Sequence, residues 1–137
     1  MKKVFIVEDN LELQHMYERA FRLGGYEVEE CASGADALER LSRPVDLPDA
    51  ILLDIIIPEV SGLDVLRSIR KDKKWDCVPV IMLTNSFAPA NEQLFLSLGA
   101  NMYITKMDHD AAYIVEKTEE CLFGACTAHT KDEVVVV

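Results

Sequence analysis

The stretch AILLDIII, residues 50–57, is an almost unbroken apolar run that becomes β-branched toward its end. A strand that is covered by helices on both faces of a parallel sheet has this composition, because neither of its faces meets water. The run therefore predicts a central strand of a parallel sheet. Its single charge, Asp54, lies within or just after that strand and is hard to explain by packing.

Further apolar runs of strand length alternate with segments whose apolar residues recur at helical spacing. We expect strands at residues 4–7, 26–32, 50–57, 78–85 and 102–105. We expect a helix after each strand. The first ends at Gly24 and Gly25, and its inner face carries Leu13, Met16, Tyr17, Ala20 and Phe21. The second is capped by Ser33, and the other three lie within 61–70, 91–101 and 110–123. Regular alternation of this kind indicates an open, doubly wound parallel sheet.

The chain of 137 residues, half of them hydrophobic, has the length and composition of one globular domain, which we place at residues 1–123. The remaining tail, 124–137, ends in four valines without helical periodicity. Three interpretations of the tail stay open: disorder, addition to a sheet edge of a neighbouring molecule, or the stump of a longer protein.

Charge and hydropathy narrow the functional classes. Lys and Arg number 14 against 24 Asp and Glu, and this net charge of −10 argues against direct nucleic-acid binding. No apolar run reaches the ~20 residues of a membrane span, and the start holds no signal peptide, so we expect a cytoplasmic protein without membrane contact. The four cysteines show no C-x-x-C pairing and are expected to be reduced thiols.

Charged and hydroxyl side chains stand at the ends of four predicted strands: Glu8 with Asp9, Asp54, Thr84 and Lys106. Ligands of a doubly wound sheet bind beyond the carboxyl ends of its strands, where these groups would converge. Crowded carboxylates raise one another's pKa unless a cation lies between them. Mg²⁺ prefers such oxygens, which predicts a magnesium site with Asp9 and Asp54 as direct ligands and Glu8 acting through water.

A carboxylate beside Mg²⁺, a lysine and a hydroxyl is also what phosphoryl transfer needs, with Asp54 as the natural acceptor. Any one strand-end acid is as often a plain solvated residue, so the hypothesis depends on the combination.

Four stretches resemble the receiver domains of bacterial two-component response regulators: VEDN (7–10), LLDIIIPEVSG (52–62), MLTNS (82–86) and YITK (103–106). They are similar, in order, to the family's acidic pair, phosphoacceptor loop, switch threonine and invariant lysine. The intervals fit as well, since Thr84 follows Asp54 by 84 − 54 = 30 positions and Lys106 follows Thr84 by 106 − 84 = 22. The resemblance covers residues 2–123 and includes the stand-alone, chemotaxis-regulator type.

The resemblance implies a flavodoxin-like (βα)5 fold with a five-stranded parallel sheet in the order 2-1-3-4-5. It implies a phosphoacceptor rather than an enzyme, one that catalyses only its own phosphorylation and dephosphorylation on Asp54. The donor would be a histidine kinase, a phosphotransfer protein or a small phosphodonor. The output would be a changed surface that binds a downstream protein or, as a homodimer, a second copy.

The resemblance also assigns roles to single residues. Thr84 and Lys106 would contact the phosphoryl group, and Tyr103 would be the aromatic residue that reports it. Mg²⁺ would be held by four groups: the carboxylates of Glu8, Asp9 and Asp54 and the backbone carbonyl of Ile56.

Departures from the family's pattern leave one alternative open. Met107 follows Lys106 where the family usually has a proline in a cis peptide, so we expect this bond to be trans. Met107 and Asn85 keep open a pseudo-receiver that binds proteins without phosphorylation. A haloacid-dehalogenase-like phosphatase would need a second acid where Ile56 stands, and a flavodoxin-like carrier would need a phosphate loop that VEDNLEL does not offer.

Overall fold

A five-stranded parallel sheet with the order β2-β1-β3-β4-β5 forms the centre of the molecule. The structure, a computed structural model, describes residues 2–43, 47–85 and 89–123. The strands are β1 (Lys3–Val7), β2 (Glu27–Cys31), β3 (Ala50–Asp54), β4 (Val80–Thr84) and β5 (Met102–Thr105). The predicted doubly wound (βα)5 fold and its strand order are confirmed.

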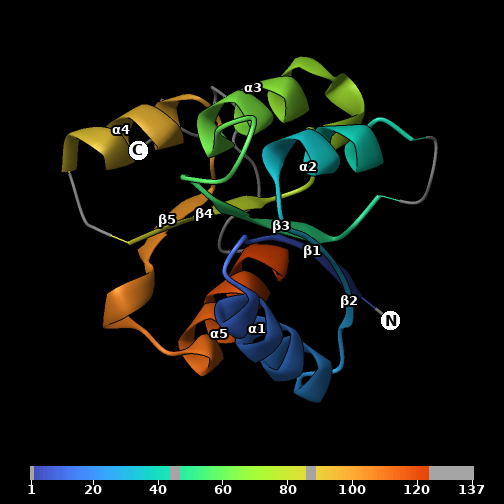
Figure 1. Ribbon diagram of the computed structural model, residues 1–137, viewed down its shortest axis with the longest axis vertical. Helices are drawn as coiled ribbons and strands as arrows, with labels where there is room; N and C mark the ends of the chain where they lie inside the picture. Colours follow the sequence, from blue (N-terminus) through green and yellow to red (C-terminus); the bar gives the residue numbers. More distant parts are fainter. Residues whose placement is uncertain (1, 44–46, 86–88, 124–137) are drawn as a thin grey trace.

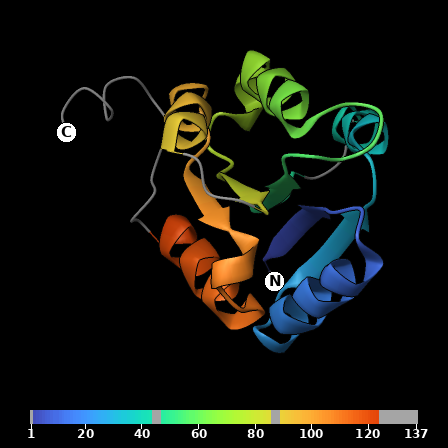
Figure 2. The same ribbon diagram turned by 60° about the vertical axis from the view of Figure 1, so that its left-hand side comes forward.

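Helices cover both faces of this sheet (Figures 1 and 2). One face carries α1 (Leu11–Leu23) and α5 (Ala111–Leu122), and the other carries α2 (Gly34–Leu41), α3 (Gly62–Lys71) and α4 (Pro89–Ser97). Two short 3₁₀ turns complete the described elements, η1 (Lys73–Trp75) and η2 (Lys106–Asp108). None of the helices within the described residues has the length and hydrophobicity that a membrane span requires.

Side chains of each strand point alternately to the two helical layers, because successive residues of a strand face opposite sides. The layer of α1 and α5 packs on one set of strand residues: Val4, Ile6, Ala50, Leu52, Ile81, Leu83 and Ile104. The layer of α2, α3 and α4 packs on the other set: Phe5, Val7, Ile51, Leu53, Val80, Met82 and, partly buried, Tyr103. Every residue of β3 and β4 is buried, as the apolar runs predict.

Four of the described helices, α1, α2, α3 and α5, begin with a side-chain cap. Asn10, Ser33, Ser61 and Asp110 each accept a hydrogen bond from the backbone N–H three residues on, at 2.9 to 3.3 Å. Such caps satisfy one of the free N–H groups in the first turn of a helix. These four caps fix where α1, α2, α3 and α5 begin, and the N-cap expected at Ser33 is confirmed.

Two details differ from the sequence-based expectations. The strand expected at 50–57 ends at Asp54, because the chain turns there to meet α3: the Gly62 N–H donates to the Ile55 carbonyl at 2.8 Å, and Ile56 is left 77% exposed. The inner face of α1 is also rotated from the expected stripe. Gln14 is buried there, whereas Met16 is 45% exposed.

The cysteines that the structure describes are free thiols, as expected. Cys31 and Cys121 are buried and Cys77 is exposed. Burial raises the pKa of the Cys31 thiol to about 11, which keeps it protonated and unreactive at neutral pH. Cys126 and the tail 124–137 lie outside the described residues, and the boundary at residue 123 stays a prediction.

We predict that Gly62→Ala lowers the free energy of unfolding by about 1–3 kcal/mol. A Cβ at Gly62 would overlap the Asp54 carbonyl oxygen and lie 2.8 Å from the Ile55 Cα, so α3 or the end of β3 must shift. Urea unfolding measures the loss. Gly24→Ala is the matched control, because the nearest atoms to its Cβ, including one of Val115, are 3.4 Å away. Equal losses in the two variants would contradict this account.

Candidate functional site

Three charged residues continue the face of the sheet that packs against α1 and α5. Asp54 is the last residue of β3, and Glu8 and Lys106 come one residue after the ends of β1 and β5. Residues two apart in a strand lie on the same face of the sheet. Glu8 therefore continues the face of Val4 and Ile6, Asp54 continues that of Leu52, and Lys106 continues that of Ile104. The Glu8 N–H still donates to the Cys31 carbonyl at 3.1 Å, so the strand pairing holds Glu8 in this alignment.

The ammonium of Lys106 joins two of these strand ends to its own. Its Nζ lies 2.8 Å from Glu8 Oε1 and 3.1 Å from Asp54 Oδ2. All three side chains are nearly closed to solvent, with 4% of Lys106, 1% of Glu8 and 5% of Asp54 exposed. Burial alone would lower the pKa of Lys106, but the hydrogen bond that Lys106 donates to Glu8 and the charges of both carboxylates outweigh burial and raise this pKa. Lys106 is therefore a buried cation that spans β1, β3 and β5.

Glu8 has a partner at each oxygen. Oε1 accepts from Lys106, and Oε2 accepts the Asn10 N–H at 3.1 Å. Burial raises the pKa of its carboxyl and the charge of Asp54 adds to this, while the bonds from Lys106 and Asn10 act in the opposite direction. The net shift is upward, as the crowding of carboxylates predicts.

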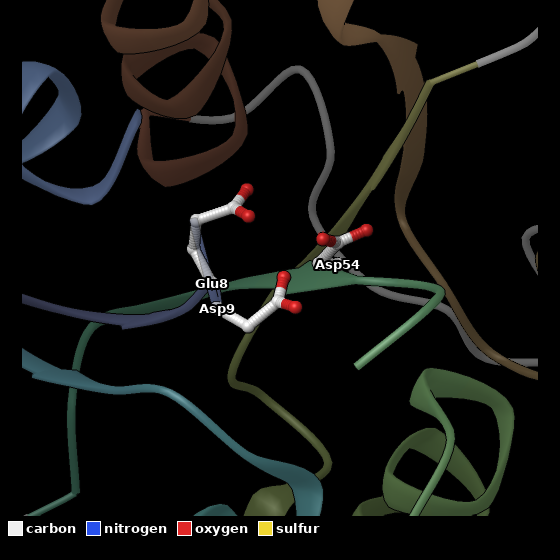
Figure 3. Close-up of side chains that lie close together, drawn as sticks. All are labelled: Glu8, Asp9 and Asp54. Carbon is white, nitrogen blue, oxygen red and sulfur yellow. The ribbon is translucent and has the colours of Figure 1, made fainter. Parts of the chain in front are cut away.

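Glu8, Asp9 and Asp54 offer carboxylate oxygens that all lie within 4.8 Å of one another (Figure 3). Figure 3 shows the three side chains gathered at the ends of β1 and β3. Asp9 is exposed, whereas its two neighbours are buried, so the cluster opens to solvent at Asp9. Hard oxygen donors at this separation suit Mg²⁺, which keeps several waters and needs an open side.

The loop after Asp54 contributes backbone groups to the same place. The Ile56 N–H donates to Asp54 Oδ1 at 3.3 Å, while the Ile56 side chain points to solvent. Asp54 thus receives Lys106 at one oxygen and Ile56 at the other. Both contacts hold the Asp54 side chain in place, and a carboxylate oxygen is the nucleophile that phosphoryl transfer to an aspartate needs.

Thr84 and Tyr103 belong to the other face of the sheet, which is covered by α2, α3 and α4. Thr84 is 8% exposed and pairs in register with Thr105, while Tyr103 pairs with Met82. Tyr103 therefore lies two residues before the end of β5. Its ring centroid lies 5.8 Å from that of Phe95 on α4, and its hydroxyl is buried without a hydrogen-bond partner among the residues that the structure describes.

The segment after Lys106 forms the turn η2. Among the described residues no peptide bond is cis, so the bond from Lys106 to Met107 is trans, as expected. Met107 is 79% exposed and Asn85 is also exposed, whereas Thr105 is buried. Met107 and Asn85, which depart from the family's pattern, therefore do not occupy space among the buried charged residues Glu8, Asp54 and Lys106.

Two buried residues of α1 next to this site were not singled out from the sequence. Gln14 donates hydrogen bonds to backbone carbonyls at the ends of β1 and β2. Tyr17 is 2% exposed, and burial together with the charges of Glu8 and Asp54 raises the pKa of its hydroxyl. The available signal was the spacing of Gln14, Tyr17 and Phe21, which lie on one face of a helix.

The sequence matches the family described as the response regulator receiver domain over residues 4–119. This chain belongs to that family. Receiver domains are signalling domains of two-component systems, and phosphorylation and Mg²⁺ use are general features of that family.

Relatives and solved structures agree with the assignment to receiver domains. The polar-differentiation response regulator DivK of Brucella ovis is 37% identical over 105 residues, which are 77% of this chain and 84% of DivK. The transcriptional regulatory protein CpxR homolog of Haemophilus influenzae is 33% identical over 83% of this chain, but the match spans only 48% of that relative. The chemotaxis response regulator CheY4 of Vibrio cholerae has a TM-score of 0.79 and 26% identity, with 90% of this chain and 99% of CheY4 covered.

We predict that the pH dependence of stability differs between the wild type and Glu8→Gln in metal-free buffer with EDTA. Because the folded state raises the pKa of Glu8 above 4.5, it holds this proton more tightly than the unfolded chain does. The free energy of unfolding should therefore fall as the pH rises above 4.5. Glu8→Gln should lose this slope, which is at most about 1.4 kcal/mol per pH unit.

Urea unfolding at a series of pH values measures this difference. Glu12→Gln, at an exposed acid of α1, is the control and should keep the wild-type slope. The same slope in Glu8→Gln and in the wild type would contradict the raised pKa.

Proposed function

We propose that this receiver domain accepts a phosphoryl group on Asp54, with Mg²⁺ bound, from a histidine kinase or a phosphotransfer protein. The phosphoryl group then switches a surface that binds another protein. The observation that supports this most is the buried contact of Lys106 with both Glu8 and Asp54. A structural ion pair needs one carboxylate, whereas two buried carboxylates with one lysine leave an excess negative charge that suits a further cation.

Mg²⁺ would be held by the carboxylates of Asp9 and Asp54 and by the Ile56 carbonyl. Glu8 would act through a water molecule, since Mg²⁺ usually keeps several of its waters. When bound, Mg²⁺ supplies positive charge to the phosphoryl oxygens.

Asp54 is the nucleophile in this proposal. One of its oxygens forms a bond to phosphorus while the bond from phosphorus to the imidazole nitrogen of the donor breaks, and the electron pair stays on that nitrogen. Lys106 and the Thr84 hydroxyl would then contact oxygens of the transferred group as donors. The domain speeds its own modification and returns to its starting state by hydrolysis, so it acts as a signalling domain rather than as an enzyme on other substrates.

Exposed apolar side chains around the site favour a protein as the donor. Leu11, Ile56 and Met107 follow the ends of β1, β3 and β5 and are 62%, 77% and 79% exposed. A small phosphodonor needs no such apolar rim, whereas a protein that presents a phosphohistidine would bury it. The rim therefore supports a histidine kinase or phosphotransfer protein over a small molecule.

The output half of the proposal links Thr84 to Tyr103. A phosphoryl group on Asp54 would draw the Thr84 hydroxyl toward it, and Tyr103 would respond because both belong to the α4 side of the sheet. The partner would be a downstream protein or a second copy of the chain. The pseudo-receiver alternative has less support, since its usual signature is the loss of the acceptor or of the acidic pair, and Asp54, Glu8 and Asp9 lie together here.

Asp54→Asn should abolish phosphorylation by phosphoramidate or acetyl phosphate, and the wild type should be labelled only when Mg²⁺ is present. The amide of asparagine cannot form the acyl phosphate, and without Mg²⁺ the carboxylates repel the incoming dianion. Intact-protein mass spectrometry measures the added phosphoryl group. Asp64→Asn, an exposed acid at the start of α3, should be labelled like the wild type. Labelling of Asp54→Asn, or labelling of the wild type in EDTA, would overturn the proposal.

Thr84→Ala should uncouple Tyr103 from the phosphoryl mimic beryllofluoride, and Thr84→Ser should keep the coupling because it retains the hydroxyl. A coupling of about 1–3 kcal/mol is typical between allosteric sites and shifts a population several-fold or more. The ring resonances of Tyr103 in NMR spectra report the shift when beryllofluoride and Mg²⁺ are added. Equal shifts in Thr84→Ala and in the wild type would show that the hydroxyl carries no signal.

A further inference from the structure

Gln14 is a buried polar residue on α1 that the proposed chemistry does not use. It is 6% exposed, and its Nε2 donates to two backbone carbonyls, that of Glu8 at 3.0 Å and that of Cys31 at 3.1 Å. These carbonyls lie just after β1 and at the end of β2, at the carboxyl edge of the sheet. Gln14 therefore ties α1 to two adjacent strand ends beside the acidic cluster.

Only a donor with two N–H groups fits this position. Both partners are carbonyl oxygens, so the nitrogen of the carboxamide must face them, and its two hydrogens match the two acceptors. An oxygen placed there would face two other oxygens without a proton between them. The Cys31 carbonyl already accepts the Glu8 N–H at 3.1 Å, so the bond from Gln14 adds to a strand pairing that is formed without it.

The bond to the Glu8 carbonyl has a consequence for Asp9. That carbonyl belongs to the planar peptide unit between Glu8 and Asp9. A hydrogen bond to its oxygen therefore fixes the plane that contains the Cα of Asp9. The other contacts of this turn hold different groups: the Asn10 N–H binds the Glu8 side chain, and the Asn10 side chain binds the N–H of Leu13. Among these contacts, the one from Gln14 holds the peptide oxygen.

We infer that Gln14 is a positioning residue for the Mg²⁺ site: it sets the direction of Asp9 by holding the peptide unit between Glu8 and Asp9. Gln14 itself touches neither the metal nor the phosphoryl group. This inference rests on the proposed function, since it gives Asp9 its role as a metal ligand. Asp9 is exposed and is the member of the acidic cluster that burial does not hold, so its direction depends on its backbone.

The test compares Gln14→Met with the wild type, because methionine has a similar length and no donor. Isothermal titration of the full chain with MgCl₂ gives the Kd, at a temperature where circular dichroism shows both proteins to be folded. We expect the Kd to rise about tenfold, in the range seen when residues that orient metal ligands are removed. NMR hydrogen exchange of the metal-free proteins should show faster exchange at the Asp9 and Asn10 amides in Gln14→Met.

Phe21→Leu is the control for lost stability alone. Phe21 is fully buried on the same inner face of α1, and its side chain has no hydrogen-bonding group. Phe21→Leu should therefore have a lower melting temperature than the wild type but the same Kd for Mg²⁺. Gln14→Asn is the second test variant, since it keeps the amide but is too short to reach both carbonyls. Asp9→Asn should remove most of the Mg²⁺ binding.

An unchanged Kd in Gln14→Met and in Gln14→Asn would overturn the inference about Gln14 while leaving the proposed function intact. An equal rise of the Kd in Phe21→Leu would overturn it as well, because loss of stability alone would then explain the effect. If the wild type itself binds no Mg²⁺, the metal site of the proposed function is wrong. If Gln14→Met does not fold, Gln14→Asn and the exchange rates of the wild-type Gln14 side-chain amide decide, and rapid exchange of that amide would overturn the inference.

Discussion

The buried ammonium of Lys106 is the contact on which the carboxyl edge of this sheet depends. It lies within hydrogen-bond distance of Glu8 and Asp54 and thereby joins β5 to β1 and β3, which do not neighbour it in the sheet. Removing three charges from water is costly, and a pair of carboxylates with one lysine does not neutralise the charge. The arrangement therefore keeps an unbalanced negative charge beside solvent at Asp9. This is the place where the proposed divalent cation and phosphoryl group would bind.

The parts of this molecule that depend on pattern were predictable from the sequence. Apolar runs gave the positions of the strands to within a few residues, and the charged residues after them pointed to the edge of the sheet where the site lies. The strand order came from the resemblance to receiver domains, because periodicity carries no information about which strands pair. Helix starts such as that at Ser33 were predictable because a cap is a local interaction between residues three apart.

Other features depend on contacts between segments that are distant in the sequence. β3 ends at Asp54 because its next carbonyl binds Gly62 at the start of α3, although the apolar run continues for three more residues. Gln14 is buried because its partners, the carbonyls of Glu8 and Cys31, are brought together by the pairing of β1 with β2. The spacing of Gln14, Tyr17 and Phe21 places Gln14 on the buried face of a helix, but a glutamine is interpreted as solvent-facing unless its partners are known, so this signal alone does not predict the rotation of α1.

The alternation of the strands separates the chemistry from its proposed readout. Glu8, Asp54 and Lys106 continue the face covered by α1 and α5, whereas Thr84 and Tyr103 belong to the face covered by α4. In the proposed function, a signal from Asp54 would therefore pass from one side of the sheet to the other, between the adjacent strands β3 and β4. Asp54 pairs in register with Leu83, and Thr84 is the next residue of β4. Thr84 is the last residue of β4 and comes one residue after Leu83, the partner of Asp54. Its side chain ends in a hydroxyl that can donate a hydrogen bond. A small movement of its side chain toward Asp54, as proposed, would leave space on the α4 side, where the ring of Tyr103 packs against that of Phe95. The Tyr103 hydroxyl is buried without a partner among the described residues, which makes the position of that ring costly. In the proposed function, this would lower the free energy that a phosphoryl group must supply to shift the ring.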